Sequence, residues 1–214
     1  GFRGWIFEKI LLGLEFEKYR VVSDSTRRQL ENFKKSEKIS LVRNRVDRDF
    51  WRGASEEERR VARNNLGFRA GEKVLFFYGH AGFSKGFGLI SQVLAEVSRL
   101  ENCRFVFCFA GAQRDLRAKK IVHDFGKFQV FSEISEEKLR EILWAVDLVV
   151  APSRAEGFGF VQAETALAGQ KLLTAAVAAI PEVCRGETVF VDPENPVELR
   201  EKIQKFVAGK LEFV

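Results

Sequence analysis

The sequence contains no methionine, only two histidines and only three cysteines among its 214 residues. Cys103, Cys108 and Cys184 are embedded in apolar runs, and none of them belongs to a CxxC pair. We therefore expect buried free thiols in a reducing compartment rather than disulfides. Because His80 and His123 leave almost no material for a His/Cys zinc site, we expect no metal site.

Long apolar runs are also absent. No stretch approaches the ~20 apolar residues that a membrane-spanning helix needs. The first nine residues mix charged with apolar side chains and do not resemble a secretory signal. We expect a cytoplasmic location, which leaves room for peripheral contact with the inner face of the membrane. The start at Gly1 and the lack of methionine predict that the chain is a piece of a longer protein.

Charge of one sign is not concentrated anywhere, although the net charge is +5 and the isoelectric point about 9.2. A basic balance suits nucleic acid, anionic lipid or a phosphorylated ligand. Here Lys and Arg are interleaved with Glu and Asp, as in EEERRVAR and EEKLREIL, which favours solvated helix faces. No nucleic-acid-binding motif occurs, so we expect no nucleic-acid partner.

Short apolar runs alternate with amphipathic helical stretches, which is typical of βαβ units with a parallel sheet. Strands are expected at 74–79, 104–111, 128–131, 147–152, 171–175 and 188–192. Helices are expected at 87–100, 113–126, 136–145, 159–168 and 196–207. Ser135 suits the cap of one helix, and Pro196 suits the first turn of another. Runs such as VLFFY are apolar at every position, which fits strands buried on both faces. The sequence predicts an α/β fold, a Rossmann-like parallel sheet with helices on both faces.

The segment ahead of this unit has a different pattern. We expect an amphipathic helix at 2–18, strands at 19–23 and 38–42, and between them a helix STRRQLENF capped by Asp24 or Ser25. Residues 43–53 are polar and irregular, as in a linker. We therefore predict two parts, residues 1–53 and a compact domain at 54–214.

The first loop of chemical interest is GHAGFSKG, residues 79–86, which follows a predicted strand. Its glycines let the backbone approach a ligand, and His80 and Lys85 place two basic groups around the turn. The helix that starts after it also attracts anions. The spacing is neither that of a P-loop nor that of a GxGxxG fingerprint. Two interpretations of this loop are therefore possible, a structural turn and an anion-binding site.

The second loop, SRAEGFGFVQAE at residues 153–164, also follows a predicted strand. Glu156 precedes the expected helix and Glu164 lies about two turns into it, while Gly157 and Gly159 expose backbone N–H groups at its start. One reading makes Glu156 a helix cap and Glu164 a solvated residue. Against it, the apolar surroundings of Glu164 require a partner for a carboxylate, and a ribose diol is one such partner.

At this point the sequence resembles a known family. PSRAEGFGFVQAETALAG followed by AAIPEV resembles the E-x7-E signature of retaining GT-B glycosyltransferases with the "glycosyl transferases group 1" domain. Glu156 and Glu164 match its two glutamates, and Lys85 matches the lysine of the family's earlier glycine-rich loop. NRVDRDF at 44–50 is similar to the family's interdomain element, and the likeness runs from about residue 19 to 206. The resemblance implies the C-terminal, donor-binding half of a GT-B fold, with the end of an acceptor domain and a linker at 1–53.

The resemblance also implies roles for individual residues. Lys85, helped by His80, would neutralise the donor diphosphate. Glu156 would face the hydroxyls of the transferred sugar and Glu164 would bind the ribose, so that Lys85 and Glu156 are the expected catalytic residues. Further donor contacts are expected from Gly79, Ser132, Ile134, Gly157, Phe158, Gly159 and Phe160. Of these, Ser132 and Ile134 belong to the segment that would contact the base.

As a member of this family, the protein would transfer a sugar from a nucleotide-diphosphate sugar with retention of configuration, and no separate cofactor is expected. The acceptor would be a saccharide or a lipid-linked molecule held by the N-terminal domain, as in polysaccharide or glycoconjugate biosynthesis. Nearly all of that domain is expected to be absent, so this fragment alone should be inactive.

Two positions depart from the family pattern. His80 stands where an arginine is usual, and Arg45 stands where the linker usually has glycine. With the acceptor half expected to be missing, these departures keep an alternative open, a non-catalytic module that binds or senses nucleotide sugars. A structural Rossmann-like domain that binds nothing is the third reading.

Overall fold

The computed structural model describes residues 13–111, 115–125 and 128–213. The chain divides into two compact units, residues 1–45 and residues 46–214. The expected division at residue 53 into the end of an acceptor domain and a donor domain stays a prediction. Among the described residues, no helix is both long and apolar enough to cross a membrane.

The first unit is a small parallel pair of strands joined by a helix. Strands β1 (Tyr19–Val21) and β2 (Ile39–Leu41) pair in parallel, with helix α2 (Asp24–Glu31) between them and a 3-10 turn at Ser36–Lys38. The predicted cap is wrong, because Ser23 rather than Asp24 or Ser25 accepts a hydrogen bond from the Thr26 N–H. The helix expected at 2–18 is also wrong over 14–18, which are not helical, and residues 1–12 lie outside the described residues.

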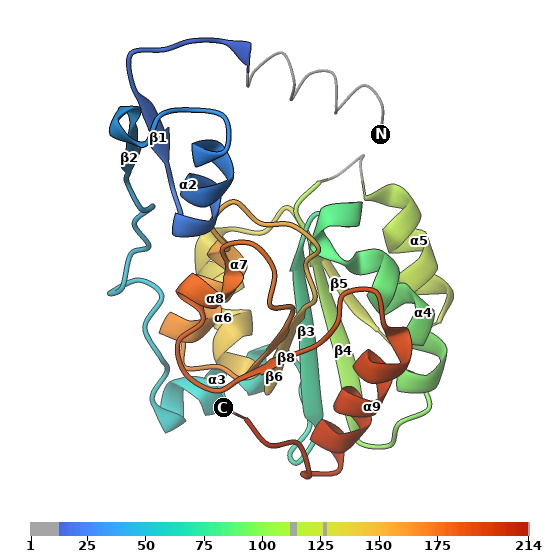
Figure 1. Cartoon of the computed structure of the whole chain (residues 1–214). Coiled ribbons are helices and arrows are strands. Elements are labelled where there is room, and N and C mark those ends of the chain that lie inside the picture. The colour runs from blue at the N-terminus through green and yellow to red at the C-terminus, as the bar shows by residue number, and fades with distance from the viewer. Residues whose placement is uncertain (1–12, 112–114, 126–127, 214) are drawn as a thin grey trace. The chain divides into compact units, whose positions relative to one another are not determined.

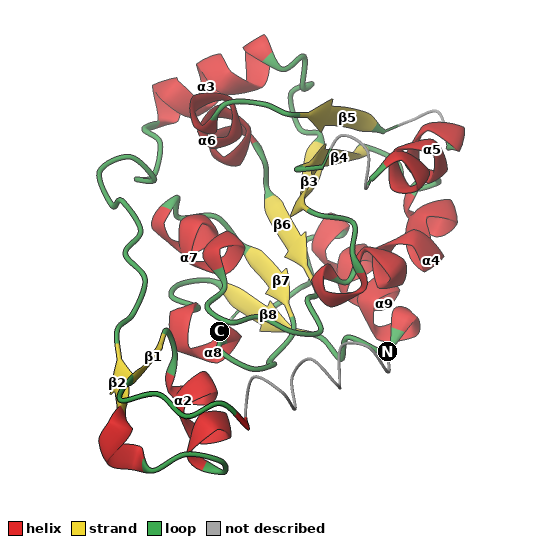
Figure 2. Cartoon of the chain, turned by 90° about the horizontal axis from the view of Figure 1, so that it is seen from above, coloured by secondary structure: helices red, strands yellow, loops and turns green. Residues whose placement is uncertain are grey.

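The second unit contains a parallel sheet of six strands, seen from above in Figure 2. The strands are β3 (Lys73–Gly79), β4 (Cys103–Phe109), β5 (Gln129–Ser132), β6 (Leu148–Ala151), β7 (Leu172–Thr174) and β8 (Thr188–Phe190). Their spatial order is β5-β4-β3-β6-β7-β8, with every neighbouring pair parallel. All six expected strands are confirmed, each within two residues at either end.

Helices cover both faces of this sheet (Figure 1). They are α3 (Glu56–Asn65), α4 (Phe87–Val97), α5 (Leu116–Asp124), α6 (Glu136–Ala145), α7 (Phe160–Leu167), α8 (Ile180–Val183) and α9 (Pro196–Val207). Ser135 caps α6 and Pro196 opens α9, both as expected from the sequence. The sequence did not predict the short helix α8.

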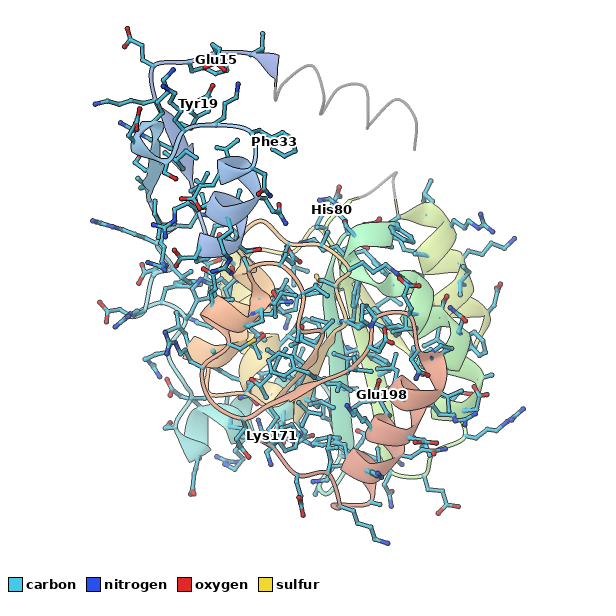
Figure 3. All side chains as sticks on the ribbon, in the orientation of Figure 1. Glu15, Tyr19, Phe33, His80, Lys171 and Glu198 are labelled. Atoms are coloured by element: carbon cyan, nitrogen blue, oxygen red, sulfur yellow. The ribbon has the colours of Figure 1, made fainter. Side chains whose placement is uncertain are left out.

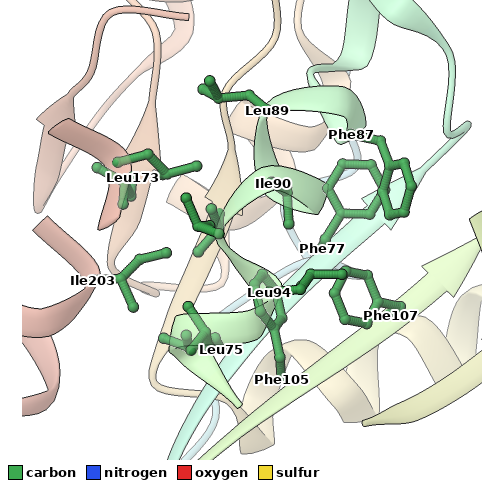
Figure 4. Packing of buried hydrophobic residues seen from close by; sticks show 14 of the residues in the cluster. Leu75, Phe77, Phe87, Leu89, Ile90, Leu94, Phe105, Phe107, Leu173 and Ile203 are labelled. Atoms are coloured by element: carbon green, nitrogen blue, oxygen red, sulfur yellow. The ribbon is translucent and has the colours of Figure 1, made fainter. Parts of the chain in front are cut away.

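Alternation along the strands explains why both faces are covered. Leu75 and Phe77 of β3 pack with α4, α5 and α9, whereas Phe76 and Tyr78 pack with α3 and α6. Phenylalanine rings of β3, β4 and α4 fill the first of these cores, where Phe77 lies 5.8 Å from the ring of Phe87 (Figure 4). Strands buried on both faces need apolar residues at every position, which is the pattern that the sequence shows.

The strand order also creates a switch point. Chain connections from β3 run outward through β4 to β5 on one side, and from β6 through β7 to β8 on the other. Strands β3 and β6 are therefore adjacent at the place where the order reverses. In open α/β sheets, ligands bind beyond the carboxyl ends of the strands at such a point.

Candidate functional site

The two loops that the sequence singled out follow the two strands of the switch point. Residues 80–86 connect β3 to α4, and residues 152–159 connect β6 to α7. Because parallel strands present their carboxyl ends at one edge, the two loops emerge side by side from the same edge of the sheet. His80, labelled in Figure 3, marks this edge, and Lys171, just before β7, marks the opposite one.

Backbone contacts hold the two loops together. The Ser84 carbonyl accepts hydrogen bonds from the Arg154 N–H at 2.7 Å and the Ala155 N–H at 3.3 Å. Gly86 has a φ of 75°, and a Cβ built on it would lie 2.0 Å from the Pro152 carbonyl oxygen. Glycine is required here both by the left-handed conformation and by this close approach.

A charged pair crosses between the loops directly above these contacts. Lys85 Nζ lies 2.7 Å from Glu156 Oε1, which also accepts a 2.9 Å hydrogen bond from the Ser153 hydroxyl. The Glu156 side chain is only 8% exposed, whereas Lys85 is 28% exposed. The lysine ammonium has three donors, and Glu156 is the only partner that the structure describes for it. Its remaining donors are available for an anion.

Both helices that begin at the switch point lack a side-chain cap. Gly86 precedes α4 and Gly159 precedes α7, each in the left-handed region, and no described side chain bonds their first N–H groups. In contrast, α3, α6 and α9 are capped by Ser55, Ser135 and Asn195. Uncapped first-turn N–H groups and the positive end of the helix dipole attract anions. Two such helix starts converge on one place.

Glu164 lies in the second turn of α7 and has a different partner from Glu156. Its Oε2 is 3.0 Å from the hydroxyl of Tyr78, a buried residue near the end of β3. Burial raises the pKa of the Glu164 carboxyl to about 7, the Tyr78 hydrogen bond opposes this shift, and the charge of Glu136 adds to it. The reading of Glu164 as a solvated helix residue is therefore wrong. Glu156 is not a helix cap either.

His80 faces a buried carboxylate. Its Nδ1 lies 3.8 Å from Oδ2 of Asp115, whose side chain is 2% exposed. Asp115 also accepts 3.0 Å hydrogen bonds from the N–H groups of Ala81 and Gly111, which belong to the loops after β3 and β4. Asp115 thus connects two neighbouring loops and places a negative charge beside the imidazole.

The remaining predicted residues divide into two groups. Gly157 is exposed, Phe158 is buried, and the ring of Phe160 lies half-exposed 5.0 Å from that of Phe158, so this segment lines the start of α7. Ser132 is exposed at the end of β5 and Ile134 is half-buried in the loop that follows. β5 is the edge strand, two positions from β3. The structure describes no contact of Ser132 or Ile134 with the Lys85–Glu156 pair.

Four residues near the site were missed by sequence reasoning. Tyr78, Ser153 and Asp115 contact predicted residues, and Gln162 is fully buried with an amide oxygen that has no described hydrogen-bond partner. Ser153 and Gln162 belong to the second loop segment 153–164, so the sequence could have suggested them. Tyr78 and Asp115 appear as parts of an apolar strand and a charged helix start, and neither pattern indicates a partner.

One hollow that the structure describes in this unit lies away from the two loops. A cavity of about 780 Å³ is at the amino ends of β3 and β4, where Glu72 pairs with Arg104 at 3.1 Å. None of the predicted site residues lines it. Within the described parts of the chain, no three His, Cys, Asp or Glu side chains gather as a metal site would require.

The family model "Glycosyl transferases group 1" matches residues 58–212. Among curated proteins, the chain is 25% identical over 166 residues to an uncharacterized glycosyltransferase from Methanocaldococcus jannaschii, a match that covers 75% of this chain and 42% of that protein. It is 27% identical over 180 residues to a D-inositol 3-phosphate glycosyltransferase from Mycobacterium marinum, covering 80% and 37%. The chain thus spans less than half the length of these relatives.

Solved structures share the fold. Sucrose-phosphate synthase from Thermosynechococcus elongatus superposes with a TM-score of 0.79 at 20% identity, covering 96% of this chain and 52% of that one. HepE from Anabaena, solved with UDP and glucose, superposes with a TM-score of 0.75 at 18% identity, covering 89% and 53%. The predicted fold class is confirmed, a Rossmann-like α/β domain that matches the C-terminal half of GT-B glycosyltransferases.

Proposed function

The chain belongs to the glycosyl transferases group 1 family, and on that premise we propose that residues 46–214 bind a nucleotide-diphosphate sugar as the donor half of a retaining glycosyltransferase. One observation carries the proposal. Two uncapped helix starts and a lysine with spare donors converge at the switch point of the sheet. HepE from Anabaena, which shares the fold, has been solved in complex with UDP and in complex with UDP-glucose.

The diphosphate is proposed to lie between the two helix starts. Lys85 would contact it directly, and the first-turn N–H groups of α4 and α7 would donate to its oxygens. His80 would add a second basic group, with Gly79 allowing close approach of the backbone. As the donor bond breaks, negative charge grows on the leaving nucleotide, and these preorganised donors stabilise it.

The two glutamates are proposed to divide the rest of the donor. Glu156, held by Lys85 and Ser153, would accept hydrogen bonds from the transferred sugar, and the segment Gly157–Phe160 would surround it. Glu164 would bind the ribose diol. The base would contact the loop after β5, which contains Ser132 and Ile134. Retention of configuration and a cytoplasmic location remain parts of this proposal.

Calorimetric titration with a nucleoside diphosphate and with the matching nucleotide sugar tests the assignment. A thermal-shift panel of UDP-glucose, ADP-glucose and GDP-mannose first selects the donor, since a ligand at 100 times its dissociation constant adds about 2.7 kcal/mol of stability. Glu164→Gln should then weaken the binding of the free nucleoside diphosphate and of the nucleotide sugar equally, by about tenfold or more. Glu156→Gln should weaken only the part of the affinity that the sugar adds.

Wild-type affinity of both variants for the free nucleoside diphosphate would refute the ribose role of Glu164. No thermal shift with any member of the panel would refute donor binding by the chain.

A non-catalytic module that binds nucleotide sugars is the second candidate. It is favoured by His80, which stands where the family usually has arginine. Donor binding supports both candidates, so a transfer assay with the full-length protein distinguishes them. Turnover supports the enzyme, and tight donor binding without turnover supports the module.

A further inference from the structure

The hydroxyl oxygen of Tyr78 lies within hydrogen-bond distance of two acceptor oxygens, one from Val161 and one from Glu164. The number of protons available to these three oxygens depends on whether Glu164 is ionised. The Tyr78 hydroxyl oxygen lies 2.9 Å from the carbonyl oxygen of Val161 and 3.0 Å from Oε2 of Glu164. A carbonyl only accepts hydrogen bonds, and so does an ionised carboxylate. The single proton of Tyr78 therefore serves one of the two contacts when Glu164 is ionised, and the other contact has no proton.

Among the described residues, the neighbouring hydroxyl of Thr165 does not supply the missing proton. The Thr165 hydroxyl donates to the Val161 carbonyl at 2.6 Å, so its proton is already used. Tyr78 keeps its own proton, because burial and then the nearby Glu164 charge raise the pKa of the phenol. When Glu164 is protonated, each of the two contacts has a proton, because Glu164 donates to Tyr78 and Tyr78 donates to the Val161 carbonyl.

We propose that Tyr78 positions Glu164 and shares a proton with it in the empty site, and that this proton is released when a ribose diol binds. The inference rests on the proposed function for its ligand, while the proton in the empty site follows from the protein geometry alone. On binding, the carboxyl O–H bond of Glu164 breaks and the proton passes to the solvent. Tyr78 then donates to the carboxylate, a diol hydroxyl donates to it as well, and Thr165 still serves Val161.

The charges around Glu164 agree with this assignment. Glu136, in the first turn of α6, and the carboxyl's own burial both disfavour the ionised form and raise the pKa of Glu164 to about 7. Cys108 on β4 is an electrostatic neighbour of Tyr78. Burial raises the pKa of the Cys108 thiol to about 11, so the thiol stays neutral near pH 7. Among the described residues, no basic group is a cause of the Glu164 shift.

The sign of the pH dependence follows. A diol binds better to the ionised carboxylate, so it lowers the pKa of Glu164 in the complex. Affinity should increase as pH rises through about 7 and then level off. Any other group that binds or releases a proton when the donor binds contributes equally to wild type and to Glu164→Gln. The difference in the pH dependence of affinity between wild type and Glu164→Gln therefore isolates the contribution of Glu164.

The first experiment needs no ligand. Carboxyl-carbon NMR of protein labelled at glutamate Cδ is followed against pH, and Glu164→Gln assigns the Glu164 resonance. We expect that resonance to titrate near pH 7. In Tyr78→Phe its midpoint should move up by about one pH unit, because the carboxylate loses a donor. A Glu164 midpoint near the ordinary value of 4.5 would overturn the proposal.

The second experiment measures the proton on binding. The donor selected from UDP-glucose, ADP-glucose and GDP-mannose is titrated calorimetrically in Hepes and in Tris, which differ in ionisation enthalpy. Wild type should release about half a proton more than Glu164→Gln at pH 7, and almost none more at pH 9. Tyr78→Phe should bind about fivefold more weakly at pH 7, because a smaller fraction of Glu164 is ionised, and recover most of the affinity at pH 9.

Tyr19→Phe is the matched control, since Tyr19 is the other tyrosine of the sequence and donates to Leu14 in the first unit. Its affinity should equal that of wild type at both pH values. An equal loss at pH 7 and pH 9 in Tyr78→Phe would mean a merely structural role and would overturn the inference. Binding without any Glu164-dependent proton would also overturn it and would leave donor binding intact. Failure of every nucleotide sugar to bind would refute the proposed function, while the NMR titration still decides the proton.

Discussion

The two ends of strand β6 carry charged clusters that are built in opposite ways. At its amino end, Asp147 accepts from Arg59 at 2.7 Å, from Arg63 at 3.2 Å and from the Val74 N–H at 2.7 Å. The same two arginines also donate to the carbonyl groups of Trp144, Ala145 and Val146 at the end of α6. At the carboxyl end, Lys85 has the single described partner Glu156, and the helices that begin there are uncapped.

The difference separates structural from functional polar groups. At the amino end, the carboxylate is bound from three sides and the two arginines direct most of their donors to protein atoms. At the carboxyl end, donors of Lys85 and of two helix starts remain unused. A polar cluster whose donors are satisfied stabilises the fold, whereas spare donors that face one place can bind an anion.

The largest effect is expected from Gly86→Ala, which tests how much of the carboxyl end belongs to the fold. A methyl group there would lie 2.0 Å from the Pro152 carbonyl oxygen in a left-handed conformation. We expect the free energy of unfolding, measured by urea denaturation, to fall by about 4 kcal/mol. Gly88→Ala is the control, because a Cβ there meets nothing within 4 Å. That variant should gain up to about 1 kcal/mol, and equal effects of the two would contradict the role of Gly86.

Asp147→Ala tests the structural end of the strand. It leaves Arg59 and Arg63 partly buried without their carboxylate, so the free energy of unfolding should fall by about 3 kcal/mol. Urea denaturation measures this, and calorimetry of the folded fraction should show unchanged donor affinity. Glu57→Ala, which breaks an exposed pair with Arg60, should cost less than about 0.5 kcal/mol. A large loss of donor affinity in Asp147→Ala would contradict the claim that the charged cluster at the amino end of β6 serves only the stability of the fold.

Glu164→Gln should change how stability depends on pH. The folded pKa of Glu164, about 7, is above its ordinary value of 4.5, so its stabilising contribution is complete below about pH 4.5. That contribution is lost as pH rises through about 7. The free energy of unfolding of the variant minus that of wild type should therefore increase by about 2 kcal/mol from pH 5 to pH 8. Urea denaturation at both pH values measures this change, and a constant difference would show that Glu164 ionises normally.

Lys85→Ala should affect binding more than folding. Removal of a charged donor from the proposed diphosphate site should weaken nucleotide-sugar binding by about tenfold, as measured by calorimetry. The unfolding free energy should change by no more than about 1 kcal/mol, because Ser153 still donates to Glu156. Lys171→Ala, which removes a lysine paired with Glu187 at the opposite edge, should bind like wild type. Normal affinity in Lys85→Ala would place the anion elsewhere.

Local patterns in the sequence predicted most of the secondary structure of the second unit, although not the short helix α8. Continuous apolar runs marked β3, β4 and β6 because these central strands are buried on both faces. Ser135 and Pro196 marked the starts of α6 and α9, since a serine cap and a first-turn proline act within a few residues. The same logic failed at Ser23, where three consecutive residues of the segment Ser23–Ser25 are all good caps.

Partners across the site required the tertiary structure. The resemblance to an E-x7-E signature singled out Glu156 and Glu164 as candidates, yet it did not indicate that the first pairs with Lys85, 71 residues away, and the second with Tyr78, 86 residues away. These contacts exist because β3 and β6 are neighbours in the sheet, although two strands separate them along the chain. Hydrophobic periodicity specifies which residues a strand buries, but the pairing of strands depends on packing over the whole sheet. For that reason the chain alone predicted the elements and the candidate residues, while the sheet order decided which of them meet.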